Sequence, residues 1–297
     1  MLSGLHLLLT YNCLYECDHC FLYCHPGAEG TFTLAQLERA LDQGVEAGAS
    51  SVYLEGGEPF LYYPLLLEAL RLARVRGLDT GLVSNCYWAT GERDAELWLK
   101  PLRDLGLVDL SFSDDAFHSE DPAQSPAKVA ARVAAALGLP VGSICIEPPT
   151  IAPSPARAAD GAVIGGDVLL KGRAADKLVE DLPRQTFERF DTCPHEELET
   201  PGRVHVDPFG NVFVCQGISI GNIWQRPLQQ IMQEYDPAAH PIVGPLLRGG
   251  PAELARVYGV PDESGFVEHC HLCFLVRRGL LERFPEMLRP AQVYGRG

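Results

Sequence analysis

Positive charge is scarce in this chain of 297 residues. Its 24 lysines and arginines, of which only four are lysines, are outnumbered by 39 aspartates and glutamates, and the net charge is −15. We find no run rich in lysine or arginine, whereas a protein that binds nucleic acid needs clustered cations to displace the counterions of the phosphates. A nucleic-acid partner is therefore not expected.

Long hydrophobic runs are missing as well. No apolar stretch reaches the roughly 18–20 residues that span a bilayer, and the N-terminus lacks the charged region and the longer apolar run of a signal peptide. These absences predict a cytoplasmic protein without a membrane partner. Because 46% of the residues are hydrophobic, the chain can bury the core of one large barrel-type domain, alone or with a small appendage.

Cysteine, by contrast, is abundant, with ten residues. In a reducing compartment, clustered cysteines more often indicate metal binding or catalysis than disulfides. Cys13, Cys17 and Cys20 lie within eight residues, and three thiolates complete neither a tetrahedral zinc site nor a four-iron cluster with a cysteine on each iron. One coordination position is therefore left open. A structural zinc loop is the alternative, with Cys24 or His25 as its fourth ligand.

Short apolar runs alternate with amphipathic segments up to about residue 180. Strands are expected at 4–10, 51–55, 79–84, 107–113, 141–147 and 167–171, and helices after a capping box at Thr33 and at 62–76, 92–104 and 125–137. This alternation indicates parallel βα units. Six units predict an α/β fold, a partial (β/α)6 barrel of the TIM type, with its active site at the carboxyl ends of the strands.

The pattern changes near residue 183, where prolines become frequent and no further βα unit is visible. A β-hairpin is expected at 204–214 because two apolar runs flank Pro208-Phe209-Gly210. Short helices are expected at 227–235, 252–258 and 274–287. We therefore predict two domains, the barrel in 1–183 and a smaller cysteine-rich extension in 184–297.

Two motifs in the first domain resemble those of the radical S-adenosylmethionine (radical SAM) superfamily. They are the spacing Cys13-x3-Cys17-x2-Cys20 and the segment Gly56-Gly57-Glu58-Pro59 directly after a predicted strand. In that family the three cysteines hold a [4Fe-4S] cluster whose remaining iron binds SAM, and the GGEP loop holds the SAM ammonium group. Glycines suit this role because the backbone can approach a ligand closely; the alternative is an ordinary strand-to-helix turn.

The resemblance implies further SAM contacts at the strand ends. Ser84 and Ser113, with Asn85 as a neighbour, occupy positions where polar residues contact the ribose and the carboxylate of SAM. Ile146 would flank the adenine. Arg132, on the predicted fourth helix, corresponds to an arginine that pairs with the SAM carboxylate, and a solvated position on the helix face is the alternative.

The resemblance does not identify the residues that act on a substrate. The candidates are Asp115, His118, Glu147, Cys86 and Cys145, with Arg173 as a further pocket residue. Asp115 and His118 lie in a segment similar to the S-x-D-x-x-H of relatives, where they either face the substrate or hold the loop. Cys86 and Cys145 could donate a hydrogen atom to a substrate radical, or are small buried residues.

A second cysteine set, Cys193, Cys215, Cys270 and Cys273, resembles the twitch domain, the shortened relative of the SPASM extension of radical SAM enzymes. A full SPASM extension needs cysteines beyond Cys273, and the sequence has none there. The resemblance thus implies one auxiliary [4Fe-4S] cluster with four protein ligands. Zinc is the alternative, because the spacing would be the same.

The resemblance implies a radical SAM oxidoreductase or maturase. Such an enzyme reductively cleaves SAM to a 5′-deoxyadenosyl radical, which abstracts hydrogen from a substrate, and the auxiliary cluster would make the net reaction an oxidation. The expected partners are a one-electron reductant, such as flavodoxin or ferredoxin, and a small metabolite or a peptide. A metabolite is favoured because the first strand begins by residue 5, which leaves no room for an N-terminal peptide-recognition domain. The alternatives are a peptide maturase that forms thioethers or epimerises residues, and a non-catalytic zinc-binding scaffold.

Overall fold

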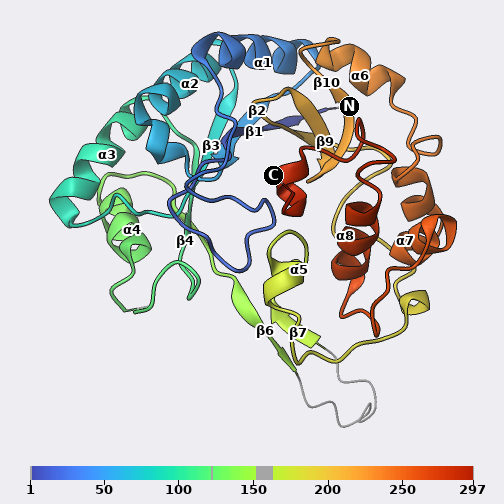
Figure 1. The fold of residues 1–297 in the computed structure, drawn as a ribbon. Coiled ribbons are helices and arrows are strands. Elements are labelled where there is room, and N and C mark those ends of the chain that lie inside the picture. Colours follow the sequence, from blue (N-terminus) through green and yellow to red (C-terminus); the bar gives the residue numbers. More distant parts are fainter. Residues whose placement is uncertain (1, 122, 152–162, 297) are drawn as a thin grey trace.

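A mixed sheet of eight strands is the centre of the computed structural model, which describes residues 2–121, 123–151 and 163–296 (Figure 1). In spatial order the strands are β10 (Ile218–Asn222), β9 (Asn211–Cys215), β8 (Arg203–Val206), β1 (Gly4–Thr10), β2 (Ser51–Gly56), β3 (Asp79–Ser84), β4 (Asp109–Ser113) and β5 (Gly142–Ile144). The six strands from β8 to β5 pair in parallel, and β9 and β10 are antiparallel to their neighbours. This mostly parallel α/β sheet is the predicted partial barrel.

Four helices follow the first four strands, as the alternating pattern predicts. They are α1 (Leu34–Glu46), α2 (Tyr63–Val75), α3 (Glu92–Asp104) and α4 (Pro126–Ala136), and they lie in an arc outside the parallel strands (Figure 1). Thr33 caps α1 with the expected capping box, since its side chain accepts from Gln36 N–H and Gln36 accepts from Thr33 N–H. The remaining helices are α5 (Ala174–Lys177), α6 (Leu228–Glu234), α7 (Val243–Tyr258) and α8 (His269–Gly279).

The sixth parallel strand is not the predicted one. Residues 167–171 form no strand, and Asp167 and Gly172 at the two ends of this segment both have positive φ angles, of 64° and 62°, which break an extended conformation. An antiparallel hairpin, β6 (Glu147–Ile151) and β7 (Val163–Gly166), precedes the segment instead. β8 completes the set of parallel strands by pairing with β1.

The predicted hairpin at 204–214 is present as β8 and β9, and it continues the barrel sheet across the predicted domain boundary. Val204, Val206 and Val212 belong to the same hydrophobic core as Leu5 and Leu7 of β1. The division at 183/184 therefore stays a prediction. In the described part of the chain, no helix has the length and apolar character needed to cross a membrane.

The side chains of the strands alternate between two faces of the sheet. On β1, Leu5 and Leu7 belong to the core under helices α1–α4, which is also the core of Val52 and Leu54 on β2. The residues between them on β1 and β2, such as His6, therefore lie on the opposite face, inside the barrel. This inner face leads to the carboxyl ends of the strands.

Candidate functional site

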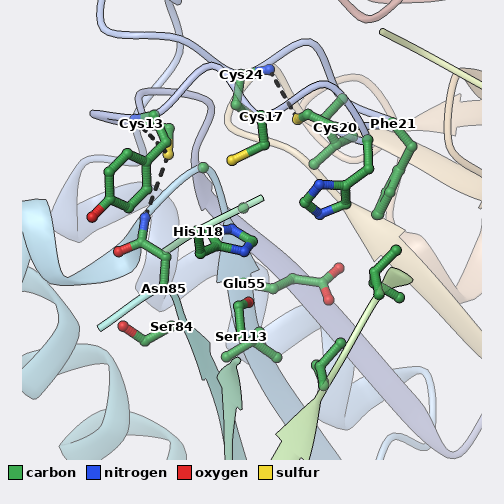
Figure 2. A pocket seen from close by; sticks show the side chains of 18 of the residues that line it. Cys13, Cys17, Cys20, Phe21, Cys24, Glu55, Ser84, Asn85, Ser113 and His118 are labelled. Carbon is green, nitrogen blue, oxygen red and sulfur yellow. Dashed lines mark hydrogen bonds between the residues drawn. The ribbon is translucent and has the colours of Figure 1, made fainter. Parts of the chain in front are cut away.

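The three clustered cysteines lie in one loop that leaves the carboxyl end of β1. Backbone bridges between Thr10 and Thr31 and between Asn12 and His25 close the base of the loop. Cys13, Cys17 and Cys20 all line one cavity of about 300 Å³ at the carboxyl ends of the strands (Figure 2). The structure thus brings the sequence-predicted ligands together around a shared space.

Gly56 and Gly57 line the same cavity and are packed directly against the first part of the cysteine loop. A Cβ atom on Gly56, whose φ is 137°, would lie 2.3 Å from the carbonyl oxygen of Thr10, and one on Gly57 would lie 2.1 Å from that of Asn12. Gly57 N–H donates to Thr10 O at 2.7 Å. Only glycine permits this approach, so the two motifs are fixed to each other.

Glu58 and Pro59 do not line the cavity but support it. Glu58 is fully buried, and its carboxylate accepts from Ser84 Oγ at 3.0 Å, from Asn85 N–H at 2.8 Å and from Phe60 N–H at 3.0 Å. Burial raises the pKa of Glu58 to about 7, although these hydrogen bonds oppose the shift. Pro59 begins a 3-10 turn, Pro59–Tyr62, whose first two residues are buried. Glu58 therefore ties the end of β2 to the end of β3.

Four predicted cofactor contacts, Ser84, Asn85, Ser113 and Ile146, line the cavity (Figure 2 labels the first three). Asn85 Nδ2 donates to Cys13 Sγ at 3.6 Å. The Ser84 hydroxyl is already engaged, because it donates to Glu58 and accepts from Trp88 Nε1 at 3.0 Å. Asn85 and Ser113 are therefore better placed than Ser84 to contact a bound molecule.

The donor set fits a bound [4Fe-4S] cluster. Burial raises the pKa of Cys13 to about 11 and that of Cys17 to about 12, so the thiolates of these two residues need a cationic centre to compensate their charge. The pKa of Cys20 is lowered instead, chiefly by the side-chain hydrogen bond of Cys24. His19 Nδ1, also at this cavity, is buried and has no hydrogen-bond partner among the described residues. Three thiols, an unpartnered imidazole nitrogen and a glycine cradle suit a cluster that keeps one position open for a second ligand.

Of the two residues considered as a fourth zinc ligand, only one lines the cavity. Cys24 lines the cavity, and its backbone N–H donates to Cys20 Sγ at 3.4 Å. His25 is outside the lining, and its Nδ1 accepts from Gly27 N–H at 3.1 Å. Cys24 is therefore the residue that could complete a zinc site.

Arg173 lies behind the cysteine loop. Its guanidinium donates to the carbonyl oxygens of Cys17 and Cys24, each at 2.9 Å, and its backbone N–H donates to Cys20 O at 2.9 Å. The side chain is buried and does not line the cavity. The predicted pocket residue thus holds the loop rather than facing its contents.

Asp115 and His118 form a hydrogen-bonded pair at the edge of the cavity, and His118 lines it. Asp115 Oδ1 lies 2.8 Å from His118 Nδ1, and the carboxylate also accepts from the N–H groups of Phe117, at 3.0 Å, and Ile146, at 3.4 Å. Burial raises the pKa of Asp115, but the hydrogen bond and charge of His118 outweigh it, and the pKa is lowered overall. Asp115 therefore positions His118 and Ile146.

Four other predicted residues are not brought to the cavity. Arg132 lies on the exposed face of α4, where its Nε is 3.6 Å from Glu92 Oε1. Cys86 is fully buried in the helix-side core, and Cys145 and Glu147 are exposed outside the cavity lining. A direct role for these side chains in the cavity is therefore not supported by their positions.

Several lining residues were not predicted from the sequence. Glu55, immediately before the double glycine, reaches the cavity from β2, and Asp167, Val168 and Leu169 reach it from the segment after β7. An acidic residue in an otherwise apolar strand is a signal that could have identified Glu55. The segment 167–169 offered no such signal, because its position depends on the turn at Asp167.

The second cysteine set also converges. Cys215 ends β9, Cys270 and Cys273 lie in the first turns of α8, and all of them line a small cavity with Cys193. Glu268 caps α8 by accepting from Cys270 N–H at 2.6 Å. The four free thiols are thus available to one metal centre.

Two buried cations accompany these thiols. Lys171 Nζ is 3.7 Å from Cys215 Sγ and 3.4 Å from Glu196 Oε1, and Arg277, also buried, lines the same cavity. Burial raises the pKa of Cys273 to about 12, although the charge of Arg277 opposes the shift. The cations offset the negative charge that four bound thiolates would carry.

Comparisons with known proteins agree with this geometry. Residues 7–146 match the model of the radical SAM superfamily. Over 115 residues, 37% of this chain, the sequence is 24% identical to the putative peptide biosynthesis protein YydG of Bacillus subtilis (strain 168). Over 127 residues, 40% of this chain, it is 34% identical to a GTP 3′,8-cyclase of Synechococcus sp. (strain CC9605). The chain spans only 35% of the length of each of these relatives.

The fold is also similar to a solved structure. The crystal structure of BtrN in complex with AdoMet and 2-DOIA superposes with a TM-score of 0.54, covering 80% of this chain and 83% of that one. The two sequences are 16% identical. At this identity the similarity concerns the fold, and it extends beyond the residues that match the family model.

Proposed function

Because residues 7–146 of this chain are a radical SAM domain, we propose that the protein is a radical SAM enzyme that abstracts hydrogen from a small metabolite or a peptide in a net oxidation. The observation that carries this proposal is the single cavity shared by the three loop cysteines, the double glycine and the ends of β3 and β4. The family implies a [4Fe-4S] cluster and SAM as cofactors. When bound and reduced by one electron, they supply a 5′-deoxyadenosyl radical.

The residues of the chain hold and orient these groups. Cys13, Cys17 and Cys20 would ligate the cluster, while Arg173 fixes their loop through backbone carbonyls. Gly56 and Gly57 would let SAM approach the backbone closely, next to Asn85 and Ser113. We assign no SAM contact to Arg132, because its ion pair with Glu92 lies on the outer face of α4.

We further propose an auxiliary [4Fe-4S] cluster at Cys193, Cys215, Cys270 and Cys273. Four cysteines around one cavity leave no coordination position for a substrate, so this cluster would move electrons, and Lys171 and Arg277 would stabilise its charge. A second centre able to accept an electron is what makes a net oxidation possible. Zinc at the same four thiols is the alternative, and it would have no redox role.

The substrate class is metabolite or peptide, and each has support from a different observation. The printed name of YydG refers to peptide biosynthesis, which favours a peptide-modifying maturase. The names of the other two proteins refer to GTP and to a complex with 2-DOIA, which favours a small molecule. We place the metabolite first because two of the three printed names refer to small molecules.

The test is anaerobic reconstitution followed by iron analysis and a SAM-cleavage assay. We expect about eight irons per chain, which corresponds to two [4Fe-4S] clusters, and formation of 5′-deoxyadenosine with dithionite and SAM. Cys20→Ala should abolish SAM cleavage, whereas Cys270→Ala should retain it and lose turnover of substrate. Colourless protein with stoichiometric zinc would instead identify the non-catalytic scaffold.

A further inference from the structure

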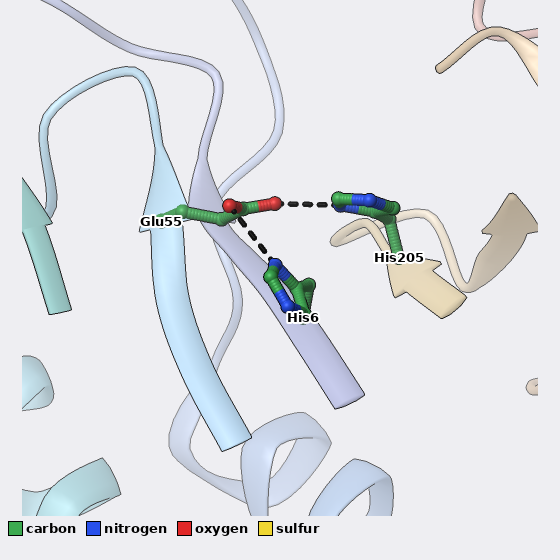
Figure 3. Close-up of side chains that lie close together, drawn as sticks. All are labelled: His6, Glu55 and His205. Atoms are coloured by element: carbon green, nitrogen blue, oxygen red, sulfur yellow. Dashed lines mark hydrogen bonds and ion pairs between the residues drawn. The ribbon is translucent and has the colours of Figure 1, made fainter. Parts of the chain in front are cut away.

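Glu55 is held between two histidines inside the barrel (Figure 3). Its Oε1 lies 2.6 Å from His205 Nδ1 and its Oε2 lies 3.2 Å from His6 Nδ1. We propose that His6, Glu55 and His205 form a binding site for a divalent transition-metal ion in the floor of the cofactor cavity. The family resemblance and the comparisons assign no role to these three residues.

The sheet fixes the three side chains with respect to one another. His6 on β1 is in register with His205 on β8, and Glu55 lies two residues beyond Tyr53, the partner of His6 on β2. All three therefore lie on the inner face of three adjacent strands. The His6 ring also stacks on Tyr53, with centroids 4.9 Å apart and planes 14° from parallel, and Tyr53 Oη donates to Asp109 at 2.5 Å. Ligands on such rigid elements are preorganised for an ion.

The donor set is chemically suited to an ion that binds both nitrogen and oxygen. Two imidazoles and one carboxylate are ligands of Zn²⁺, Fe²⁺ and their neighbours, and three protein ligands leave coordination positions open. Possible ligand atoms of the three residues all lie within 4.8 Å of one another. The open positions would face the cavity, because Glu55 is part of its lining.

Glu55 has no permanently charged partner among the described residues. Among the ion pairs of the described residues, those of Glu55 involve only His6 and His205, and no lysine or arginine. The side chain is 23% exposed, so an ion can reach the carboxylate from the cavity. A divalent cation between the three side chains would take the place of the two imidazole–carboxylate hydrogen bonds.

Two other groups of comparable residues are less suited to bind an ion. In the group of His19, Asp115 and His118, the carboxylate already accepts from two backbone N–H groups. In the group of His195, Glu268 and Cys270, the carboxylate caps α8 by accepting from two N–H groups. The Glu55 carboxylate, by contrast, is hydrogen-bonded only to the two imidazoles among the described residues, and an ion can take the place of both bonds.

The test is a Mn²⁺ titration of the anaerobic chain with its clusters reconstituted and without SAM, followed by the electron paramagnetic resonance signal of free Mn²⁺. Mn²⁺ is the probe because it prefers oxygen and nitrogen donors to thiolates. We expect one saturable Mn²⁺ per chain, displaced by Zn²⁺, which binds such sites more tightly. Glu55→Gln and His205→Phe should each weaken binding by at least about tenfold.

Asp115→Asn is the matched control, since it alters the other group of two histidines and a carboxylate, and it should leave Mn²⁺ binding unchanged. Thermal unfolding verifies folding: without Mn²⁺ the variants should melt near the wild-type protein, and Mn²⁺ should raise the melting temperature of the wild type but not of Glu55→Gln. Absence of saturable binding, binding that survives Glu55→Gln, or binding lost in Asp115→Asn would each overturn the site. Because SAM is absent, the result is independent of whether SAM is cleaved.

Discussion

The guanidinium of Arg173 donates a hydrogen bond to the carbonyl oxygen of Cys17, at 2.9 Å, across 156 residues of sequence. The same group bonds the carbonyl oxygen of Cys24. A buried cation outside the cavity lining thereby ties two parts of the cysteine loop together. The loop that would hold the cluster is thus shaped by a residue outside the cysteine motif.

Replacing Arg173 should loosen the cysteine loop. Arg173→Gln removes charge-assisted hydrogen bonds and leaves buried carbonyl groups unsatisfied, so we expect a loss of about 2 kcal/mol in the free energy of unfolding. Iron should also be removed faster by a chelator under anaerobic conditions. Arg76→Gln, which breaks a surface ion pair with Asp42, is the control and should behave as the wild type. Equal rates of iron loss in the two variants would contradict this role.

Gly57→Ala should disrupt the contact between the double glycine and the cysteine loop. The added Cβ would lie 2.1 Å from the carbonyl oxygen of Asn12, and the backbone on both sides has to move. We expect destabilisation of about 3 kcal/mol in denaturant titrations, together with weaker SAM binding in equilibrium dialysis. Gly279→Ala meets no atom within 4 Å and is the matched control. Wild-type stability and SAM affinity in Gly57→Ala would show that the loop tolerates the side chain.

Replacing Cys24 should distinguish a [4Fe-4S] cluster in the cysteine loop from a structural zinc site. The proposed cluster uses three loop cysteines, so Cys24→Ser should retain the iron of the first cluster and Cys17→Ser should lose it. A zinc site completed by Cys24 would lose its metal in both variants. Iron and zinc analysis of each purified variant makes the distinction.

Lys171 should raise the reduction potential of the auxiliary cluster. Its Nζ is 3.7 Å from Cys215 Sγ, and removing this buried positive charge makes it harder to add an electron. We therefore expect Lys171→Met to lower the reduction potential of one of the two clusters in a potentiometric titration. Lys177→Met, on an exposed position of α5, should leave both potentials unchanged. The role of Lys171 fails if both variants titrate alike.

Asp207 should make stability depend on pH. Burial raises its pKa to about 6, while hydrogen bonds from Asn211 and Tyr11 oppose the shift. The folded protein then holds a proton that the unfolded chain releases near pH 4. The stabilisation that this proton provides is fully present below about pH 4 and is lost as the pH rises to about 6. The free energy of unfolding should fall by up to about 3 kcal/mol across this window.

Asp207→Asn should reduce the fall in the free energy of unfolding between about pH 4 and 6. Urea unfolding of both proteins at several pH values between about 4 and 7 measures the difference. Asp42→Asn, at a surface ion pair, is the control and should keep the wild-type slope. Parallel profiles for the wild type and Asp207→Asn would show that the buried carboxyl does not titrate in this window.

The local pattern determined the cysteine loop, the glycine loop, the first five strands and the four helices that follow the first four strands. These features depend on neighbours in the sequence: the spacing of three thiols, the absence of Cβ atoms at Gly56 and Gly57, and the alternation of apolar runs. They also predicted that the motifs meet, because parallel strands present their carboxyl ends on one side of the sheet.

The tertiary structure decided what depends on distant segments. β8 pairs with β1 and completes the parallel strands, although the sequence placed the sixth strand at 167–171. Arg173, directly before α5, reaches the cysteine loop, whereas Arg132, which was expected near the cofactor, does not. Only the pairing of β8 with β1 brings His205 to Glu55 and His6. Long-range pairing is set by packing of the whole chain, so a local pattern of residues cannot specify it.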